Sequence, residues 1–121
     1  MQTTERSQAA GSAIAPAVAL FRGLGDSTRL TILRRLAQGE ARVVDLVREL
    51  ALSQSTVSGH LACLRDCGLV DYRPQGRQSF YFLTRTELID LLAAAERLLE
   101  ATGEAVALCP IYGGGRSERG R

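Results

Sequence analysis

The chain has 121 residues, of which 45% are hydrophobic and 23% charged, the composition of one globular domain. All 15 basic residues are arginine and 13 residues are acidic, so the net charge of +2 does not by itself indicate a nucleic-acid binder. One histidine and three cysteines exclude a multi-histidine metal site within one subunit and a disulfide framework that pairs every cysteine.

Both ends of the chain are expected to lie outside the folded domain. Residues 1–13 are small and polar without the apolar core of an export signal, which predicts a disordered arm. Residues 110–121 are rich in Gly and Arg, which predicts a flexible tail. The apolar stretch 14–21 is too short to span a membrane. We therefore expect a cytoplasmic protein with reduced thiols and one folded domain over residues 14–109.

Four helices are predicted in the first half of that domain. Apolar spacing indicates helices over about 14–23, 26–39, 43–50 and 53–66. The second and fourth begin with typical N-cap residues, Asp26 and Ser53. Two short helices joined by a tight turn, the second opening with small polar residues, are typical of a helix-turn-helix.

The hydrophobic pattern then changes to strands. Residues 69–73 and 78–83 are rich in Val, Tyr and Phe, and the Pro and Gly between them favour a hairpin turn. The fold class is thus mainly α with a small β-hairpin, a winged helix-turn-helix. A last helix over about 87–101, with Thr86 as its predicted N-cap, has a broad apolar face. Together with the first helix, this face is expected to form a homodimer interface; packing on its own core is the alternative.

The fourth helix is expected to carry its core residues and its DNA-reading residues on opposite faces. At about 100° per residue, Val57, Leu61 and Leu64 share one side, and the other side is small near the N-terminus. Such a helix can enter the major groove of double-stranded DNA, while the hairpin tip reaches a flanking groove or phosphate. A merely solvated face is the alternative, which the order helix, turn, helix and hairpin disfavours. The predicted DNA contacts are Gln54, Ser55, Thr56, Ser58, His60 and Arg77.

Two cysteines form a candidate metal site on the same helix. Cys63 and Cys67 are four residues apart, so they share a face, about a quarter turn away from the core stripe. Two thiolates in this arrangement suit one soft metal ion. Free cysteines often only fill space in a core, but a pair on the flank of a helix favours a site.

The third cysteine is a candidate for completing the site. Cys109 follows the last helix and would reach back to the pair, within its own subunit or from the partner subunit. Three sulfurs favour Cd(II) or Pb(II), with As(III) and Sb(III) as alternatives. A single histidine disfavours the nitrogen-rich sites that suit Zn(II), Co(II) or Ni(II).

Three segments resemble the ArsR/SmtB family of bacterial metal-sensing repressors. They are residues 24–33 (LGDSTRLTIL), 52–61 (LSQSTVSGHL) and the hairpin segment 76–81 (GRQSFY), and the likeness extends over roughly residues 15–108. The resemblance implies a homodimeric winged helix that represses an operator and releases it when an inducer binds.

Within the family, the chain looks like the cadmium- and lead-sensing CmtR-type branch. Residues 61–69 (LACLRDCGL) are similar to that branch's L-x-C-L-R-x-C-G-L, and Cys109 matches its later cysteine in type and approximate place. The arsenic-type cysteine motif is absent from 43–47, and the histidine motif of other sensors is absent from 88–104. The resemblance thus implies Cys63, Cys67 and Cys109 as metal ligands whose occupation misaligns the DNA-reading helices.

The sequence also bears on three further interpretations. His60 precedes Cys63 by three residues, but it belongs to the family's S-x-H-L pattern, so packing, capping or a phosphate contact is expected rather than metal ligation. A thiol-redox regulator on the same fold is an alternative, although cysteines four apart on a helix rarely form an unstrained disulfide. No nucleophile-base pair or phosphate loop stands at a credible spacing, so neither an enzyme nor an organic cofactor is expected.

Overall fold

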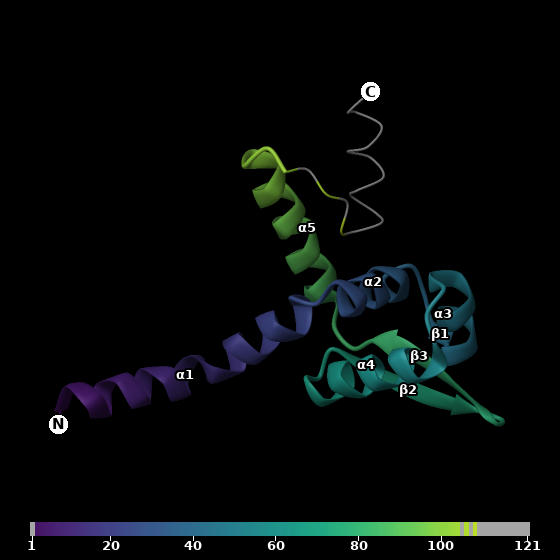
Figure 1. Ribbon diagram of the computed structural model, residues 1–121, viewed down its shortest axis with the longest axis horizontal. Helices are drawn as coiled ribbons and strands as arrows, with labels where there is room; N and C mark the ends of the chain where they lie inside the picture. Colours follow the sequence, from purple (N-terminus) through teal and green to yellow (C-terminus); the bar gives the residue numbers. More distant parts are fainter. Residues whose placement is uncertain (1, 105, 107, 109–121) are drawn as a thin grey trace.

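The computed structural model describes residues 2–104, 106 and 108, and the side chains from residue 13 onward. The chain folds into five helices and three short strands within this part (Figure 1). In chain order the elements are α1 (Gln2–Leu24), α2 (Ser27–Leu36), β1 (Ala41–Arg42), α3 (Val43–Leu50), α4 (Gln54–Asp66), β2 (Val70–Gln75), β3 (Gln78–Leu83) and α5 (Thr86–Ala101). The predicted fold class, mainly α with a small β-hairpin, is confirmed.

The compact body consists of α2, α3, α4 and the sheet (Figure 1). Its core is apolar and continuous from α2 through α4 to the hairpin, because each helix buries the stripe that its spacing predicts. The fully buried side chains include Ile32, Leu33, Leu46, Val57, Leu61, Leu64 and Val70. The three residues predicted as the core stripe of α4 are all at 0% exposure, so the opposite face of this helix is free to contact a partner.

The sheet differs from the expected hairpin by one strand. β3 is central, with β1 and β2 antiparallel on either side. β1 pairs Ala41 with Tyr81 and Arg42 with Phe80, a bridge of two residues that no periodicity can signal. β2 also continues to Gln75, so the turn consists of Gly76, at a φ of 65°, and Arg77. A two-residue turn requires a positive φ, and glycine adopts this φ without strain, so Gly76 allows the tight turn.

The two end helices project away from the body (Figure 1). α1 begins at Gln2, whereas a disordered arm was expected up to residue 13; its Ala, Glu, Gln and Arg residues are good helix formers. The proposed boundaries at residues 13 and 109 stay predictions, and the tail from residue 110 lies outside the described residues. None of the described helices combines the length and apolarity needed to cross a membrane.

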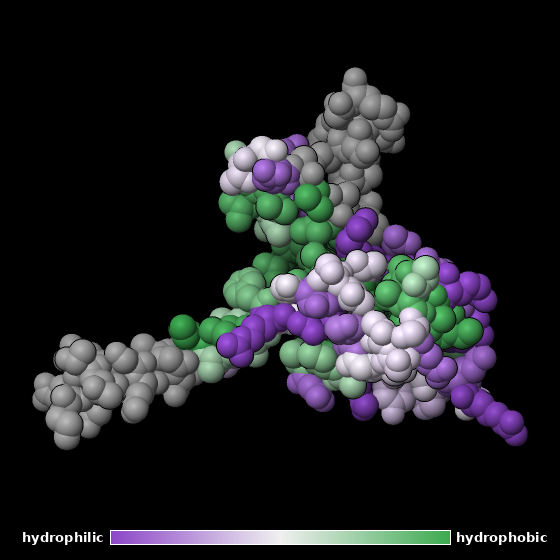
Figure 2. All heavy atoms as spheres, viewed as in Figure 1, coloured by the Kyte–Doolittle hydropathy of each residue, from purple (hydrophilic) through white to green (hydrophobic). Residues whose placement is uncertain are grey.

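Large apolar side chains remain uncovered on these projecting helices. Hydrophobic surface gathers where α1 and α5 meet the body (Figure 2). The exposed fraction is 57% for Ile14, 59% for Phe21 and 67% for Leu98. An apolar patch of this kind on a small protein typically marks a binding surface for another protein.

Candidate functional site

The N-terminal half of α4 is shaped by its cap. Ser53 accepts a hydrogen bond from the backbone N–H of Thr56 at 3.2 Å and so satisfies one of the free amides of the first turn. The turn from α3 passes through Ala51, whose backbone is left-handed with a φ of 56°. The predicted Asp26 cap is confirmed too, because Asp26 accepts from the N–H of Arg29 at 3.0 Å. The predicted cap at Thr86 is wrong: Thr86 is the first residue of α5, whose N-cap is Arg85 without a side-chain hydrogen bond.

The structure separates the predicted DNA contacts on α4 into two groups. Gln54, Ser55 and Ser58 are exposed on the outer face of the helix. Thr56 is half-buried, and its hydroxyl accepts a hydrogen bond from Ser53 at 2.8 Å. The exposed side chains have the donors and acceptors that base edges and phosphates require, and they are short enough for close approach of the helix.

His60 faces α2 rather than the outer surface of α4. Its Nε2 lies 4.0 Å from the carboxylate of Asp26, and the side chain is 25% exposed. The pKa of Asp26 is below its usual value, mainly because the carboxylate accepts the N–H of Arg29, with a smaller contribution from His60. This contact joins α4 to the start of α2, as the packing or capping interpretation of His60 expects.

Arg77 lies at the tip of the wing and is exposed. Its neighbours on the sheet are held by carboxylates: Arg73 donates to both oxygens of Glu40, at 2.9 and 2.6 Å. Arg42 donates to Asp45 in the same way, which holds the pKa of the Asp45 carboxyl far below its usual range. Among the described residues, Arg77 has no such partner, so its charge is available to a phosphate.

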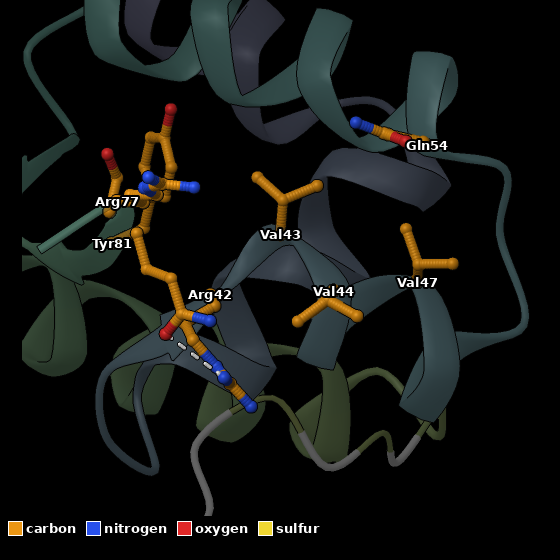
Figure 3. A pocket seen from close by; sticks show the side chains of 9 residues that line it. Arg42, Val43, Val44, Val47, Gln54, Arg77 and Tyr81 are labelled. Carbon is orange, nitrogen blue, oxygen red and sulfur yellow. Dashed lines mark hydrogen bonds between the residues drawn. The ribbon is translucent and has the colours of Figure 1, made fainter.

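A groove of about 420 Å³ joins the wing to the start of α4. Figure 3 shows Arg77 and Tyr81 at one end and Gln54 at the other, with valines of α3 between them. Only Gln54 and Arg77 of this lining were predicted from the sequence as DNA contacts, and no contact was predicted for α3. The full lining comprises Arg42, Val43, Val44, Val47, Gln54, Arg77, Gln78, Ser79 and Tyr81.

The two cysteines of α4 lie together beside the end of α1. Cys63 is half-buried and Cys67 is exposed, and both are free thiols four residues apart on the same face of α4. α1 covers one side of Cys67, since a Cβ at Gly23 would lie 3.7 Å from its Sγ. Partial burial raises the pKa of the Cys67 thiol most, and the neighbouring Cys63 raises it further, whereas the Arg29 guanidinium lowers it. The pair therefore stands outside the core, as predicted.

The two thiols could supply two of the ligands of a soft metal ion. Sulfur is the preferred donor for such ions, and the two thiols already approach each other. Within the described part of the chain, no group of three or more His, Cys, Asp or Glu side chains could hold a metal ion. Cys109, the predicted third ligand, lies outside the described residues.

Known proteins resemble the chain over its folded region. A family model described as "bacterial regulatory protein, arsR family" matches residues 26–72. A probable mercury resistance operon repressor of Streptomyces lividans is 36% identical over 89 residues, covering 74% of this chain and 71% of that protein. The regulator CmtR of Mycobacterium bovis is 39% identical over 104 residues, covering 74% of this chain and 86% of CmtR.

A solved structure supports the same assignment. The homodimeric winged helix-turn-helix DNA-binding domain of Mb0332 from Mycobacterium bovis matches with a TM-score of 0.69 and 26% identity, covering 74% of this chain and 83% of that one. The matched region contains α2, α3, α4 and the start of the wing, which form the body described above. The chain therefore belongs to the ArsR family of bacterial regulatory proteins, which are DNA-binding transcriptional regulators and not enzymes.

Proposed function

We propose that this chain is a homodimeric repressor that binds a palindromic operator and releases it when a soft metal ion occupies Cys63 and Cys67. The observation that carries the proposal is a pair of free thiols outside the core, on the same helix that exposes Gln54, Ser55 and Ser58. Reading and sensing then share one rigid element. Occupation of the pair acts directly on the helix that contacts DNA.

Operator binding relies on α4 and the wing. The exposed polar side chains of the first turns of α4 contact base edges and phosphates in the major groove. Arg77, uncommitted among the described residues, neutralises a phosphate or enters the flanking minor groove. The groove between them, lined by Tyr81 and the valines of α3, accommodates the sugar-phosphate backbone that runs from one contact to the other.

A second copy of the chain supplies the matching half-site contacts. The exposed apolar side chains of α1 and α5 provide the surface on which two copies meet. The homodimeric state of the Mb0332 domain supports this arrangement for a fold of the same family. The dimer then holds two α4 helices at the spacing of one helical turn of DNA.

The inducer is proposed to be Cd(II) or Pb(II), held by Cys63, Cys67 and Cys109. A soft ion links thiolates by strong, directional bonds that the protonated thiols do not make. The two thiols of α4 lose their protons to hold it, and Cys109 supplies a sulfur from the same or the partner subunit. The relatedness to CmtR supports these ligands, whereas the mercury resistance repressor of Streptomyces lividans makes Hg(II) a competitor to test beside arsenite and antimonite.

One titration tests the proposal. Reduced protein is mixed with Cd(II), Pb(II), Hg(II), antimonite or arsenite while thiolate-to-metal absorbance is recorded, and operator binding is followed in parallel by anisotropy of a labelled duplex from upstream of its own gene. We expect sulfur-type absorbance and loss of DNA binding with Cd(II) or Pb(II). Cys63→Ser and Cys67→Ser should abolish both signals, and Cys109→Ser should weaken ion binding.

The matched control is Ala62→Ser, which adds a hydroxyl to the exposed surface beside Cys63 without removing a sulfur. It should behave like the natural chain. Release of DNA by Cd(II) or Pb(II) from the variant lacking both α4 thiols would overturn the proposed site. Release by an oxidant in the absence of metal would instead support the thiol-redox alternative.

A further inference from the structure

The end of α1 stands between the thiol pair and the proposed dimer surface. Gly23 is buried and faces the Cys67 sulfur: a Cβ on Gly23 would be in ordinary van der Waals contact, at 3.7 Å, with both Cys67 Sγ and Leu69 Cδ1. The backbone of Gly23 therefore lies next to the Cys67 sulfur, and Gly23 has no side chain to separate them. A change in the position of the sulfur must be accommodated by α1, because packed groups transmit displacements at short range.

Arg29 holds the same end of α1 against α2. Its Nε donates to the carbonyl oxygen of Gly23 at 3.0 Å, and its Nη2 donates to that of Arg22 at 2.9 Å. These carbonyls belong to the last turn of α1, where a helix has no amides of its own to offer. The guanidinium also lies near enough to Cys67 to act on its thiol. One side chain therefore contacts both the helix end and the surroundings of the sulfur.

The far part of α1 carries exposed apolar side chains. Ile14, Val18 and Phe21 lie within three turns of the joint at Gly23, and each is at least 40% exposed. In the proposed dimer they pack against a second copy. A small rotation of α1 about Gly23 therefore changes how the two subunits meet and how far apart their two α4 helices lie.

We propose that Gly23 and Arg29 form a joint that couples the occupant of the Cys63–Cys67 pair to the orientation of α1. Gly23 gives the Cys67 sulfur a backbone neighbour, and Arg29 fixes that backbone to α2. This inference rests on the proposed function for its ligand, and it deepens that function by naming the regulatory route. Arg29 is a positioning residue here and does not contact the ion.

The decisive variant is Arg29→Met, which keeps the apolar stem and removes both guanidinium hydrogen bonds to the carbonyl oxygens of Arg22 and Gly23. Its matched control is Arg34→Met, the same change at an exposed position of α2. The coupling is the ratio of operator Kd values with and without Cd(II), which in allosteric proteins is about 5- to 150-fold. We expect Arg29→Met to keep the thiolate-to-metal absorbance and to reduce this ratio about tenfold or to one. Arg34→Met should leave both unchanged.

A second readout does not involve DNA. The amide of Gly25 donates to the Arg22 carbonyl oxygen at 3.2 Å, so its hydrogen exchange reports on the last turn of α1. Cd(II) should change this exchange rate in the natural chain and not in Arg29→Met. Arg29→Lys keeps the charge but cannot donate to both carbonyl oxygens at once, so it should give an intermediate response. It replaces Arg29→Met in this test if the Met variant does not fold.

The two proposals fail in different ways. An absence of thiolate-to-metal absorbance in the natural chain would contradict the proposed function. The joint is then tested by methylthiolation of Cys67 with methyl methanethiosulfonate, which should alter the exchange of Gly25 in the natural chain alone. Normal absorbance in Arg29→Met together with an undiminished Kd ratio would overturn the joint while leaving the metal site intact. An equal exchange response in both chains would overturn it as well.

Discussion

The two halves of α4 differ in what their outward side chains contact. In the N-terminal half, Gln54, Ser55 and Ser58 face solvent. In the C-terminal half the side chains are engaged: Arg65 is paired with Asp71 at 3.2 Å and lies 4.5 Å from the centre of the Tyr72 ring. The cysteine pair in the same half lies against α1. One half is therefore available to an external partner, and the other half is connected to the rest of the molecule.

Under the proposed function, this difference lets one helix both read DNA and sense the ion. α4 has 13 residues, about 20 Å at 1.5 Å per residue, and its backbone ladder makes it stiff. A displacement of the C-terminal half by its neighbours is carried to the N-terminal half as a rigid-body movement. In the proposed function, the stiffness of α4 passes a movement of the thiol pair along the helix, and the proposed joint at Gly23 and Arg29 transmits it to α1 and the dimer surface.

The largest expected effect comes from the residue that the two halves share. Leu61 is at 0% exposure in the middle of α4. Leu61→Ala should lower the free energy of unfolding by about 2–5 kcal/mol, because it removes buried contacts and leaves a cavity. Urea unfolding followed by circular dichroism measures it, with Ala62→Ser on the exposed side as a control expected within about 0.5 kcal/mol. Equal unfolding midpoints for Leu61→Ala and the natural chain would contradict the assigned core.

The second prediction isolates the reading surface. Arg77→Ala should weaken operator binding about tenfold and make the slope of log K against log salt shallower by about 0.9, the value for one phosphate contact. Ion binding at the thiol pair should stay unchanged. Anisotropy titrations at several salt concentrations measure the slope, and Arg97→Ala on the exposed face of α5 is the control. An unchanged slope in Arg77→Ala would remove the wing from the interface.

The third prediction weakens the N-terminal half alone. Ser53→Ala removes the acceptor for the N–H of Thr56 and should lower the free energy of unfolding by about 1 kcal/mol. Exchange of the Thr56 amide should quicken, and operator affinity should fall, while thiolate-to-metal absorbance persists. For unfolding and amide exchange the control is Ser58→Ala, which makes the same chemical change on the exposed face without touching the cap; Ser58 is itself a proposed DNA contact, so it is not a control for operator affinity. Loss of ion binding in Ser53→Ala would show that the halves are not separable.

The smallest expected effect concerns acid. Asp45 accepts from the side chain and backbone N–H of Arg42, and these bonds lower the pKa of the Asp45 carboxyl in the folded state. Its contribution is therefore present above the unfolded pKa of about 3.9 and is lost as the pH falls below it. Asp45 belongs to the capping box of α3, which packs on α4. Asp45→Asn should therefore lower the free energy of unfolding by about 1 kcal/mol near pH 6 and by less near pH 3. Urea unfolding at the two pH values measures this; equal losses at both would contradict the role of the ionised carboxylate.

Much of the architecture could be predicted from local patterns. The spacing of Val57, Leu61 and Leu64 predicts which face of α4 is buried, and the caps Asp26 and Ser53 mark where two helices start. These features depend on residues within one or two turns of each other, so periodicity and side-chain chemistry suffice. β1 was not predicted because its two residues form a strand only by pairing with β3, about 40 positions further along the chain.

The candidate site divides in the same way. The sequence by itself determined that Cys63 and Cys67 share a face of α4 and that Arg77 lies in the wing turn, since both follow from helix period and turn chemistry. Only the tertiary structure decided that Cys67 meets Gly23, that Arg29 caps α1, and that the valines of α3 line a groove between the wing and Gln54. These contacts join elements that are separate in the chain, and the packing of whole helices, which no local pattern records, brings them together.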